Sequence, residues 1–352
     1  MSLFFINFAG NMSDHRPKII FRADAGGNIG FGHLVRSAAL ASWLAPDFDC
    51  SMVCRNSSPE AEPFISGVIL ESGITRLLTD VPADLPEQEF DSMYFSLLGK
   101  DVIAVVDGYR FSSSFQEEAA SRSRALVTVD DLPDRCFPSD IFFSPSPLRR
   151  DEVALPSDAD FYAGPLHSFL RKPFLRPLRE RSRHDIKRVL IAIGGADPLG
   201  LTGKIISAAR EVSPEAELDI IAGPTVTVNP EDNAGIRIHR NLSAEEVCNL
   251  IDGSDFGIFP ASTAGMEALA RRLPIAVGWY VGNQKRYYDA GVAENLFAPL
   301  GDLRDDRAKI VQRLKEAVIS SRLSQRDTVD FNAWRKQTIE IFKQLWRKKE
   351  IR

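Results

Sequence analysis

Short apolar runs recur along this chain in two series, and that recurrence restricts the folds it can adopt. Each run has the length of a β-strand, and helical or polar stretches separate one run from the next. Strands that alternate with helices are typical of a parallel α/β sheet. The first series lies at 18–23, 50–55, 102–108, 125–131 and 140–145, and the second lies at 188–195, 217–223, 236–241, 256–262 and 274–279.

Two series of strands predict two Rossmann-like domains, at residues 17–165 and 188–325. The segment 166–187 between them contains Pro173, Pro177 and several arginines, which predicts a linker. Two such sheets joined by a linker form a cleft at the carboxyl ends of their strands, where ligands bind in this class of fold. The sequence therefore predicts an α/β protein with a ligand site between its domains.

The two ends of the chain lie outside these series. Residues 1–16 lack the basic start and the cleavage site of a signal peptide, so we expect a flexible extension, with Met1 or Met12 as the true start. Residues 326–352 place aromatic and aliphatic side chains between charges, which predicts an amphipathic helix that packs on one of the domains.

Composition argues against several classes of function. A net charge of −5 over 352 residues gives no electrostatic footprint for nucleic acid. No apolar run approaches the ~18 residues that a membrane span needs. The four cysteines have neither metal-ligand spacing nor a disulfide framework, so we expect buried thiols at Cys50 and Cys54, no metal and a cytoplasmic location.

The segment NIGFGHLVR at 28–36 is the strongest candidate for an active-site loop. Apolar residues at helical spacing after it place His33 in the first turn of a helix. The positive end of a helix dipole disfavours the imidazolium form, so His33 can act as a general base beside the bare backbone of Gly30 and Gly32. The alternative is that His33 caps the helix and the glycines only turn the chain.

Polar residues also end two strands of the first series. Asp107 and Tyr109 follow one strand, and Asp130 and Asp131 follow the next. Paired acids at neighbouring strand ends can hold a sugar or support a histidine. Aspartate is also favoured in turns, so a purely structural role stays open.

The segment IGGADPLGLTG at 193–203 is a first candidate for nucleotide binding. It follows a strand and precedes a helix, so the backbone of Gly194 and Gly195 can approach a ligand while helix N–H groups face it. A tight turn between strand and helix explains the same residues equally well.

A second nucleotide-binding candidate is FPASTAGMEAL, which places Ser262 and Thr263 at a helix start. A diphosphate there would meet N–H groups and the helix dipole. Glu267, one turn later, can accept hydrogen bonds from ribose hydroxyls, and Asn283 and Gln284 offer amides after the next strand. A helix cap with a first-turn glutamate, followed by a polar loop, is the structural alternative.

Several segments share their order and spacing with a known family. They are RADAGGNIGFGHLVRSAALA, VVDGY, VTVDDLPDR, FYAGPLHSFLRKPF, IAIGGADPLGLTG and ASTAGMEAL with a later NQ, over residues 18–295. They resemble the PseG/SpsG family of bacterial nucleotide-sugar hydrolases. The resemblance implies a GT-B fold, no metal or other cofactor, and a UDP-sugar as substrate. The family's type reaction hydrolyses UDP-2,4-diacetamido-2,4,6-trideoxy-β-L-altropyranose to the free sugar and UDP, towards pseudaminic acid.

The resemblance also assigns roles to single residues. His33 matches the family's catalytic histidine, and Tyr109 matches the tyrosine of its VDHY element. Glu267 matches its nucleotide-binding glutamate. Asn283 and Gln284 match its NQ pair. The chain departs from the family at Gly108, which replaces the usual histidine of VDHY. It also departs at FPASTAGMEAL, which has fewer glycines than the family's GxGGSxxWE.

We therefore expect His33 to deprotonate the water that attacks the anomeric carbon, with Tyr109 as a second catalytic residue. A glycosyltransferase that uses the same histidine on an acceptor hydroxyl and a non-catalytic sugar-nucleotide-binding protein are the alternatives. The residues assigned to the sugar are Asp24, Gly30, Gly32, Arg36 and Asp131, and those assigned to the nucleotide are Gly194, Gly195, Ser262, Thr263, Glu267, Asn283 and Gln284.

Overall fold

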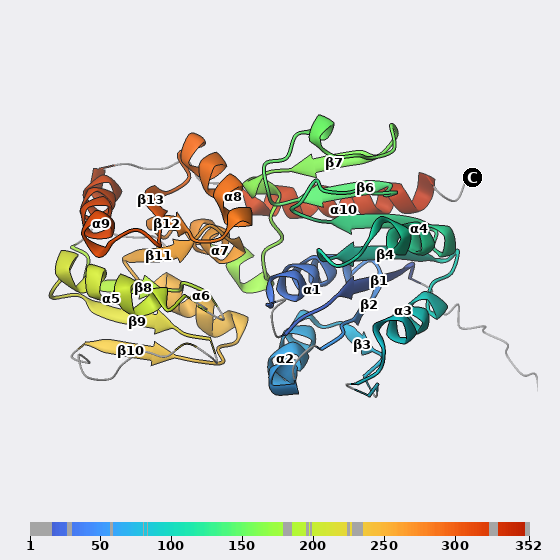
Figure 1. The fold of residues 1–352 in the computed structure, drawn as a ribbon, viewed down its shortest axis with the longest axis horizontal. Coiled ribbons are helices and arrows are strands. Elements are labelled where there is room, and N and C mark those ends of the chain that lie inside the picture. The colour runs from blue at the N-terminus through green and yellow to red at the C-terminus, as the bar shows by residue number, and fades with distance from the viewer. Residues whose placement is uncertain are drawn as a thin grey trace, which may run out of the picture.

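The chain forms two parallel sheets, each with helices on both faces (Figure 1). The expected extension up to residue 15, with Met1 and Met12, lies outside the described residues, as does Gly195. The computed structural model describes residues 16–26, 30–56, 59–79, 81–82, 84–178, 185–194, 197, 199–223, 226, 235–323 and 330–348.

The N-terminal sheet has seven parallel strands. In spatial order they are β3 (Thr75–Leu77), β2 (Asp49–Val53), β1 (Lys18–Ala23), β4 (Val102–Asp107), β5 (Ala125–Val129), β6 (Ile141–Ser144) and β7 (Asp160–Ala163). The strand order reverses between β1 and β4. In open parallel sheets that reversal is where a ligand crevice forms.

Successive residues of β1 serve opposite faces of this sheet, as the period of a strand requires. Ile19 and Phe21 pack with α1 (Gly32–Leu44) and α2 (Glu62–Ser72). Ile20 packs on the other face, with α3 (Glu87–Ser96) and α4 (Ser113–Arg122). Because both faces are covered, the central strands are mostly apolar, with Arg22 and Asp107 as buried exceptions, which made them easy to predict from sequence.

The C-terminal sheet has six parallel strands and reverses its order between β8 and β11. Helices α5 (Leu201–Val212) and α9 (Arg307–Leu323) cover one face, and α6 (Ala244–Gly253), α7 (Thr263–Ala270) and α8 (Gly282–Ala293) cover the other. The strands, in spatial order, are β10 (Ile236–His239), β9 (Glu217–Ile221), β8 (Arg188–Ile191), β11 (Phe256–Pro260), β12 (Ile275–Trp279) and β13 (Ala298–Asp302).

The predicted fold class of two α/β domains is confirmed, and each predicted apolar run contains a strand. Three strands were not predicted. β3 is three residues long, β7 is only half-buried, and β13 (APLGD) contains a proline and a glycine, so none forms a continuous apolar run. The expected burial of Cys50 and Cys54 is also confirmed.

Short 3-10 helices complete the connections between the larger elements. They are η1 (Pro59–Ala61), η2 (Arg150–Glu152), η3 (Pro165–His167) and η4 (Lys172–Leu175), and the last two lie where the sequence predicted a linker.

The chain ends in α10 (Phe331–Lys348), which packs on the N-terminal domain. Its Phe342 ring lies 6.4 Å from the Phe48 ring and 6.3 Å from the Phe143 ring, centroid to centroid. Lys343 also pairs with Asp47, 2.9 Å away. In Figure 1 this red helix lies beside the N-terminal sheet although α9, just before it, covers the C-terminal sheet. The chain therefore crosses between the domains twice.

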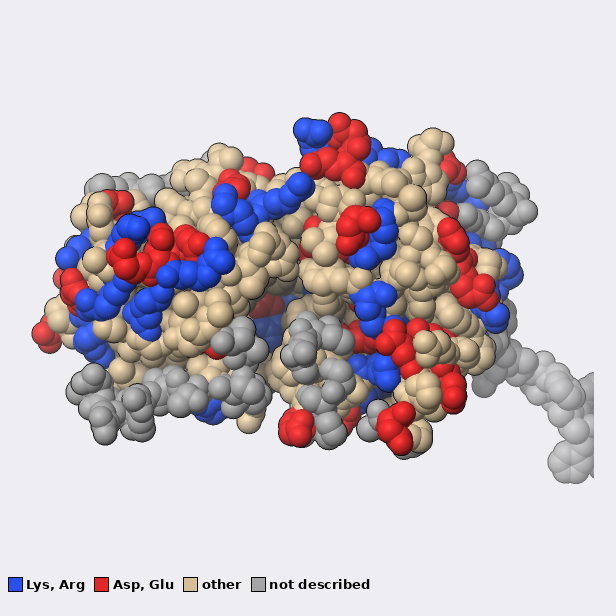
Figure 2. All heavy atoms as spheres, in the orientation of Figure 1, with Lys and Arg blue, Asp and Glu red and all other residues tan. Residues whose placement is uncertain are grey.

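The two domains leave a hollow between them, seen in Figure 2 on the face shown in Figure 1. Helices α1 and α7 each follow a strand at the reversal point of their sheet, so both begin at carboxyl strand ends.

Candidate functional site

The loop after β1 brings the start of α1 to the carboxyl end of the N-terminal sheet. Gly30 has φ of +77°, a conformation that favours glycine, and its carbonyl accepts a hydrogen bond from Gly26 N at 3.1 Å. Helix α1 begins at Gly32, so His33 lies in its first turn, as the spacing predicted. Phe31 occupies the N-cap and no side chain caps the helix, so the alternative role of His33 as a cap is not realised.

His33 is instead oriented by Asp107, the last residue of the neighbouring strand β4. Nδ1 of His33 lies 2.7 Å from Oδ1 of Asp107, and both side chains are buried. Burial alone would raise the pKa of Asp107, but the charge of Arg36 and the hydrogen bonds from His33 and Arg36 lower that pKa, so the carboxylate is ionised. An ionised carboxylate can only accept a hydrogen bond. Nδ1 therefore carries a proton, and in the neutral imidazole Nε2 presents a lone pair.

Nε2 is the group left open at this centre. No atom in the part of the chain that the structure describes forms a hydrogen bond with it. The rings of His33 and Tyr109 meet edge to face, with centroids 4.5 Å apart and planes at 87°. A neutral imidazole with a fixed Nδ1 and an open Nε2 can take a proton from water or from a hydroxyl group.

Tyr109 joins the two domains. Its hydroxyl donates to Oδ2 of Asp131 at 2.9 Å and accepts from Nδ2 of Asn283 at 3.2 Å. Asn283 lies in the first turn of α8, in the C-terminal domain. Burial, and then the charge of Asp131, raises the pKa of Tyr109, so the phenol keeps its proton at neutral pH. The structure thus brings three of the sequence candidates together across the cleft.

Arg36 lies one turn after His33 on α1, and its side chain is buried. Its Nε donates to Oδ2 of Asp107 at 2.8 Å, and its NH1 donates to Oδ2 of Asp131 at 2.6 Å. The sequence assigned Arg36 to the sugar, whereas its partners in the structure are protein carboxylates. The spacing of three residues between His33 and Arg36, which places both on one helix face, was the available signal for a shared role.

Asp24, also assigned to the sugar, lies in a buried cluster of ion pairs beside this centre. Its Oδ1 is 2.8 Å from NH1 of Arg22 and accepts from the backbone N–H of Arg55 at 3.0 Å. Its Oδ2 accepts from Nε of Arg110. Because Asp24 is only 4% exposed, protein groups rather than solvent surround its carboxylate.

Gly108, where the chain departs from the VDHY pattern, has a backbone suited to glycine, with φ of +150°. A Cβ atom at this position would lie 2.9 Å from the ring of Phe111. Phe111 is fully packed, with the guanidinium of Arg22 5.4 Å from its ring centroid. The space that a histidine at position 108 would need is therefore occupied by Phe111.

In the C-terminal domain, helix α7 begins without a side-chain cap. Ser262 occupies the N-cap in an extended conformation, but its hydroxyl donates to Pro260 O at 3.4 Å instead of accepting from the helix. The N–H groups of Thr263 and Ala264 have no hydrogen-bond partner among the described residues. Helix α6 shows the contrast, because Ser243 and Glu246 form a complete capping box there. The helix cap that was the structural alternative for FPASTAGMEAL is therefore not formed at α7.

Glu267 is 2% exposed, and both of its carboxylate oxygens accept from Arg171. The two hydrogen bonds are 2.8 Å long and join α7 to the segment just before η4. Sequence reasoning expected Glu267 to face ribose, and it did not single out Arg171 within the FYAGPLHSFLRKPF segment. The bidentate pair is one that no spacing in the sequence indicates, because 96 residues separate its members.

The other nucleotide-binding candidates are engaged by protein groups. Gly194 follows β8, but the first two N–H groups of α5 donate to the carboxylate of Asp197 at 2.8 Å each, so this helix start is already capped. Oε1 of Gln284 accepts from the backbone N–H of Tyr280 at 3.0 Å and fixes the turn after β12. Of the two candidate helix starts, α7 is therefore the open one.

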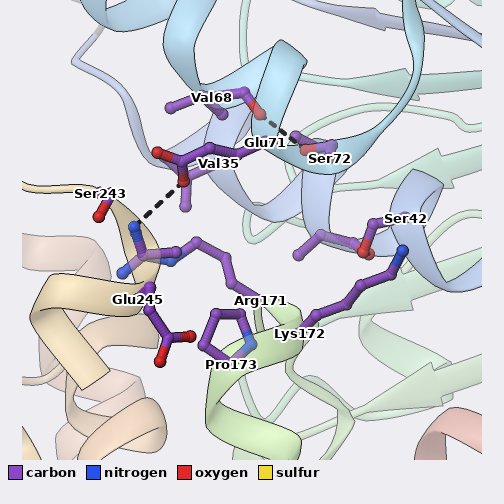
Figure 3. A pocket seen from close by; sticks show the side chains of 13 residues that line it. Val35, Ser42, Val68, Glu71, Ser72, Arg171, Lys172, Pro173, Ser243 and Glu245 are labelled. Carbon is purple, nitrogen blue, oxygen red and sulfur yellow. Dashed lines mark hydrogen bonds between the residues drawn. The ribbon is translucent and has the colours of Figure 1, made fainter. Parts of the chain in front are cut away.

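A cavity of about 250 Å³ lies between the domains on the other side of α1 (Figure 3). Glu71 and Ser72 of α2 face Arg171 and Lys172 across it. The helix face that lines the cavity carries Val35, Ala38, Ala39 and Ser42, whereas His33, Arg36 and Ser37 contact Asp107 from the opposite face. The cavity is therefore separate from the His33 centre.

The described residues show neither a metal-binding cluster nor a membrane-spanning helix. No group of three or more His, Cys, Asp or Glu side chains in those ranges is arranged to hold a metal ion. None of the helices there is both long and apolar enough to cross a membrane.

Comparison with known proteins gives distant relatives. No protein-family model matches the chain. The UDP-2,4-diacetamido-2,4,6-trideoxy-β-L-altropyranose hydrolase of Campylobacter jejuni is 23% identical over 282 residues, which cover 76% of this chain and 93% of that enzyme. An uncharacterised protein of Methanocaldococcus jannaschii is 26% identical over 142 residues, 37% of this chain, and the match spans only 29% of that relative's length.

Solved structures share the whole two-domain arrangement. MnaA of S. aureus with UDP aligns with a TM-score of 0.60 at 14% identity, over 94% of this chain and 97% of that one. The UDP-GlcNAc 2-epimerase of Methanocaldococcus jannaschii, in complex with UDP-GlcNAc and UDP, gives 0.57 at 11%, over 94% and 99%. MurG of Acinetobacter baumannii gives 0.55 at 11%, over 94% and 99%. These likenesses confirm the predicted GT-B fold.

Proposed function

We propose that this protein hydrolyses a UDP-activated deoxyamino sugar to the free sugar and UDP. The observation that carries the proposal is the geometry of His33, whose Nδ1 is fixed by Asp107 and whose Nε2 has no hydrogen-bond partner among the described residues, beside the Tyr109 ring that reaches the C-terminal domain. The distant match to the Campylobacter jejuni hydrolase, over most of both chains, supports the same chemistry. Solved structures of this fold that contain UDP support the choice of nucleotide.

In this proposal Nε2 of His33 removes a proton from water as the water oxygen forms a bond to the anomeric carbon. The bond between that carbon and the diphosphate oxygen breaks, and UDP leaves with the bonding electrons. Asp107 stabilises the imidazolium that forms, and the proton then passes to solvent. In this step the hydrogen bond between Nδ1 of His33 and Asp107 is kept.

We place the leaving diphosphate at the start of α7, where the N–H groups of Thr263 and Ala264 are unpartnered among the described residues. Negative charge develops there as the bond breaks, and N–H groups at the positive end of a helix stabilise such charge. Tyr109 and Asn283, which meet across the cleft, are placed beside the sugar. The type sugar of the relative, the 2,4-diacetamido-2,4,6-trideoxy-altropyranose, is the first candidate substrate.

The test is release of UDP from a panel of UDP-activated deoxyamino sugars without any acceptor, with wild-type protein and His33→Ala. We expect His33→Ala to lower kcat by about 10²–10⁴-fold, the usual contribution of a general base, and to leave the Kd for UDP nearly unchanged. His239→Ala is the matched control, because His239 also pairs with a buried aspartate, Asp219, but lies on the strand β10 at the sheet edge. It should behave as wild type.

Other outcomes would assign a different function. Release that requires an added acceptor would indicate a glycosyltransferase, and binding of UDP-sugars without release would indicate a binding protein. Equal release by wild type and His33→Ala would refute the role of His33.

A further inference from the structure

All three guanidinium nitrogens of Arg36 donate to protein carboxylates. Nε and NH2 donate to Asp107, with NH2 to Oδ1 at 2.7 Å, and NH1 donates to Asp131. Arg36 is 6% exposed, and Asp107 is fully buried. Two of the three guanidinium nitrogens of this cation therefore donate to the carboxylate that orients His33.

We propose that Arg36 is a positioning residue that keeps His33 in the tautomer with a free Nε2, by holding Asp107 as an oriented carboxylate. The catalytic consequence rests on the proposed function, but the tautomer itself does not. The proposal replaces the sequence-based assignment of Arg36 to the sugar.

Asp107 needs a neutralising partner because it is fully buried. A fully buried carboxylate without a neutralising partner favours its protonated form. The partners of Asp107 are Arg36, His33 and Ser37, all from α1, and Arg36 is the permanent cation among them. If Arg36 were replaced by a neutral side chain, burial would favour protonation of Asp107.

A protonated Asp107 would reverse its hydrogen bond with His33. The carboxyl O–H would donate to Nδ1 across the 2.7 Å contact, and the imidazole proton would move to Nε2. An Nε2–H imidazole cannot accept a proton at the cleft. An amide in place of the orienting aspartate of a catalytic triad has this effect, through the wrong histidine tautomer.

Arg36 also restrains the ring by its own position. Its NH2 group lies 3.1 Å from Nδ1, and a guanidinium is a donor only. With Asp107 ionised, NH2 directs its proton to Oδ1 at 2.7 Å, and Nδ1–H uses the same oxygen. Both donors thus converge on one acceptor, which fixes the plane of the imidazole.

The experiment reads the tautomer directly, by long-range ¹H–¹⁵N NMR of histidine-labelled protein. The chain has five histidines, and the spectrum of His33→Ala identifies the His33 signals. We expect the Nδ1–H pattern in wild type and the Nε2–H pattern in Arg36→Gln. Asp107→Asn should show the same Nε2–H pattern with Arg36 intact.

Kinetics on the same variants separate positioning from substrate binding. For Arg36→Gln we expect kcat to fall by about 10²-fold or more with KM changed less than about threefold, since the loss is that of the base. Arg36→Lys keeps the charge, so it should keep the Nδ1–H pattern and more of the activity. Arg76→Gln is the matched control, because Arg76 pairs with Glu62 elsewhere in the same domain.

Two results would overturn the proposal. One is an unchanged Nδ1–H pattern in Arg36→Gln, and the other is a raised KM with unchanged kcat, which would make Arg36 a substrate ligand. If Arg36→Gln does not fold, an Nε2–H pattern in Arg36→Lys, which keeps the cation, would equally refute it. A loss of the hydrolase assignment would leave the NMR result standing, so the two proposals fail separately.

Discussion

The two domains prepare their sides of the cleft in opposite ways. In the N-terminal domain, the charged groups at the strand ends pair with one another, as Arg36 does with Asp107 and Asp131, and Nε2 of His33 is left without a partner among the described residues. In the C-terminal domain, α7 begins with N–H groups that no described side chain satisfies. A satisfied network fixes the orientation of the His33 ring, whereas an uncapped helix start leaves N–H groups available to a ligand.

A second comparison lies within the C-terminal domain. Helices α5 and α7 both follow a strand next to the point where the sheet order reverses, yet Asp197 caps α5 and nothing described caps α7. A carboxylate at a helix start occupies the place that a phosphate would take. The start of α5 is therefore capped by the protein itself, whereas the start of α7 has no cap among the described residues.

The largest effect should come from breaking the buried pair of Glu267 and Arg171. We expect Glu267→Ala to lower the free energy of unfolding by about 3 kcal/mol, the lower end for a buried pair, because it leaves the Arg171 charge, whose side chain is 21% exposed, without its partner. Urea denaturation measures the change. Glu245→Ala is the control, since its pair with Arg176 is exposed and should contribute under about 1 kcal/mol. Normal stability with weaker UDP binding would instead make Glu267 a second open group of the C-terminal domain.

The next largest effect is the pH dependence of stability that Asp130 gives to the N-terminal domain. Asp130 pairs with Arg135 at 2.6 Å, but burial dominates and raises the pKa of Asp130 to about 6, opposite to the shift of Asp107. The folded state then binds a proton more tightly than the unfolded state, so this contribution to stability is present below pH 4 and declines as the pH rises to 6.

Asp130→Asn should remove that decline, which amounts to about 3 kcal/mol at most for a shift of this size. Urea denaturation of wild type and variant at pH 4, 5, 6 and 7 gives the difference, and we expect it to grow in favour of the variant up to about pH 6. A constant difference over this range would mean that Asp130 is ionised throughout and that the network is fully paired.

The smallest expected change in stability comes from adding a cap to the start of α7. The same change should have a larger effect on UDP binding. Ser262→Asp adds a carboxylate at the open helix start, and we expect a gain of about 0.3–1 kcal/mol from the helix dipole. The same charge should weaken UDP binding by about tenfold or more, because it repels the diphosphate. Calorimetry and thermal unfolding measure the two effects, and Ser243→Asp at the capped helix α6 should leave UDP binding unchanged. Tighter or equal UDP binding in Ser262→Asp would place the diphosphate elsewhere.

Local patterns in the sequence predicted the fold well, since strands covered on both faces read as continuous apolar runs. They also located His33, because a glycine-rich turn and helical spacing are local signals. The partners of these residues could not be predicted. Asp107 lies 74 residues from His33, and Asn283 lies 174 residues from Tyr109, so their contacts depend on strand order and domain docking.

Residue type alone also does not show whether a polar side chain is free to bind a ligand or is already bonded within the protein. Asp24, Arg36, Glu267 and Gln284 are chemically suited to bind a sugar nucleotide, and in the structure each is engaged by protein groups. The cap at Asp197 had a local signal, an acidic residue just before a helix start, which the interpretation of 193–203 as a ligand loop did not use.

The return of α10 to the N-terminal domain has a consequence for how that domain is built. Its packed structure draws on residues both before and after the C-terminal domain, so the C-terminal domain is an insertion in sequence terms. A fragment that ended at residue 165 would lack α10 and would uncover the apolar rings of Phe48 and Phe143, on which Phe342 packs.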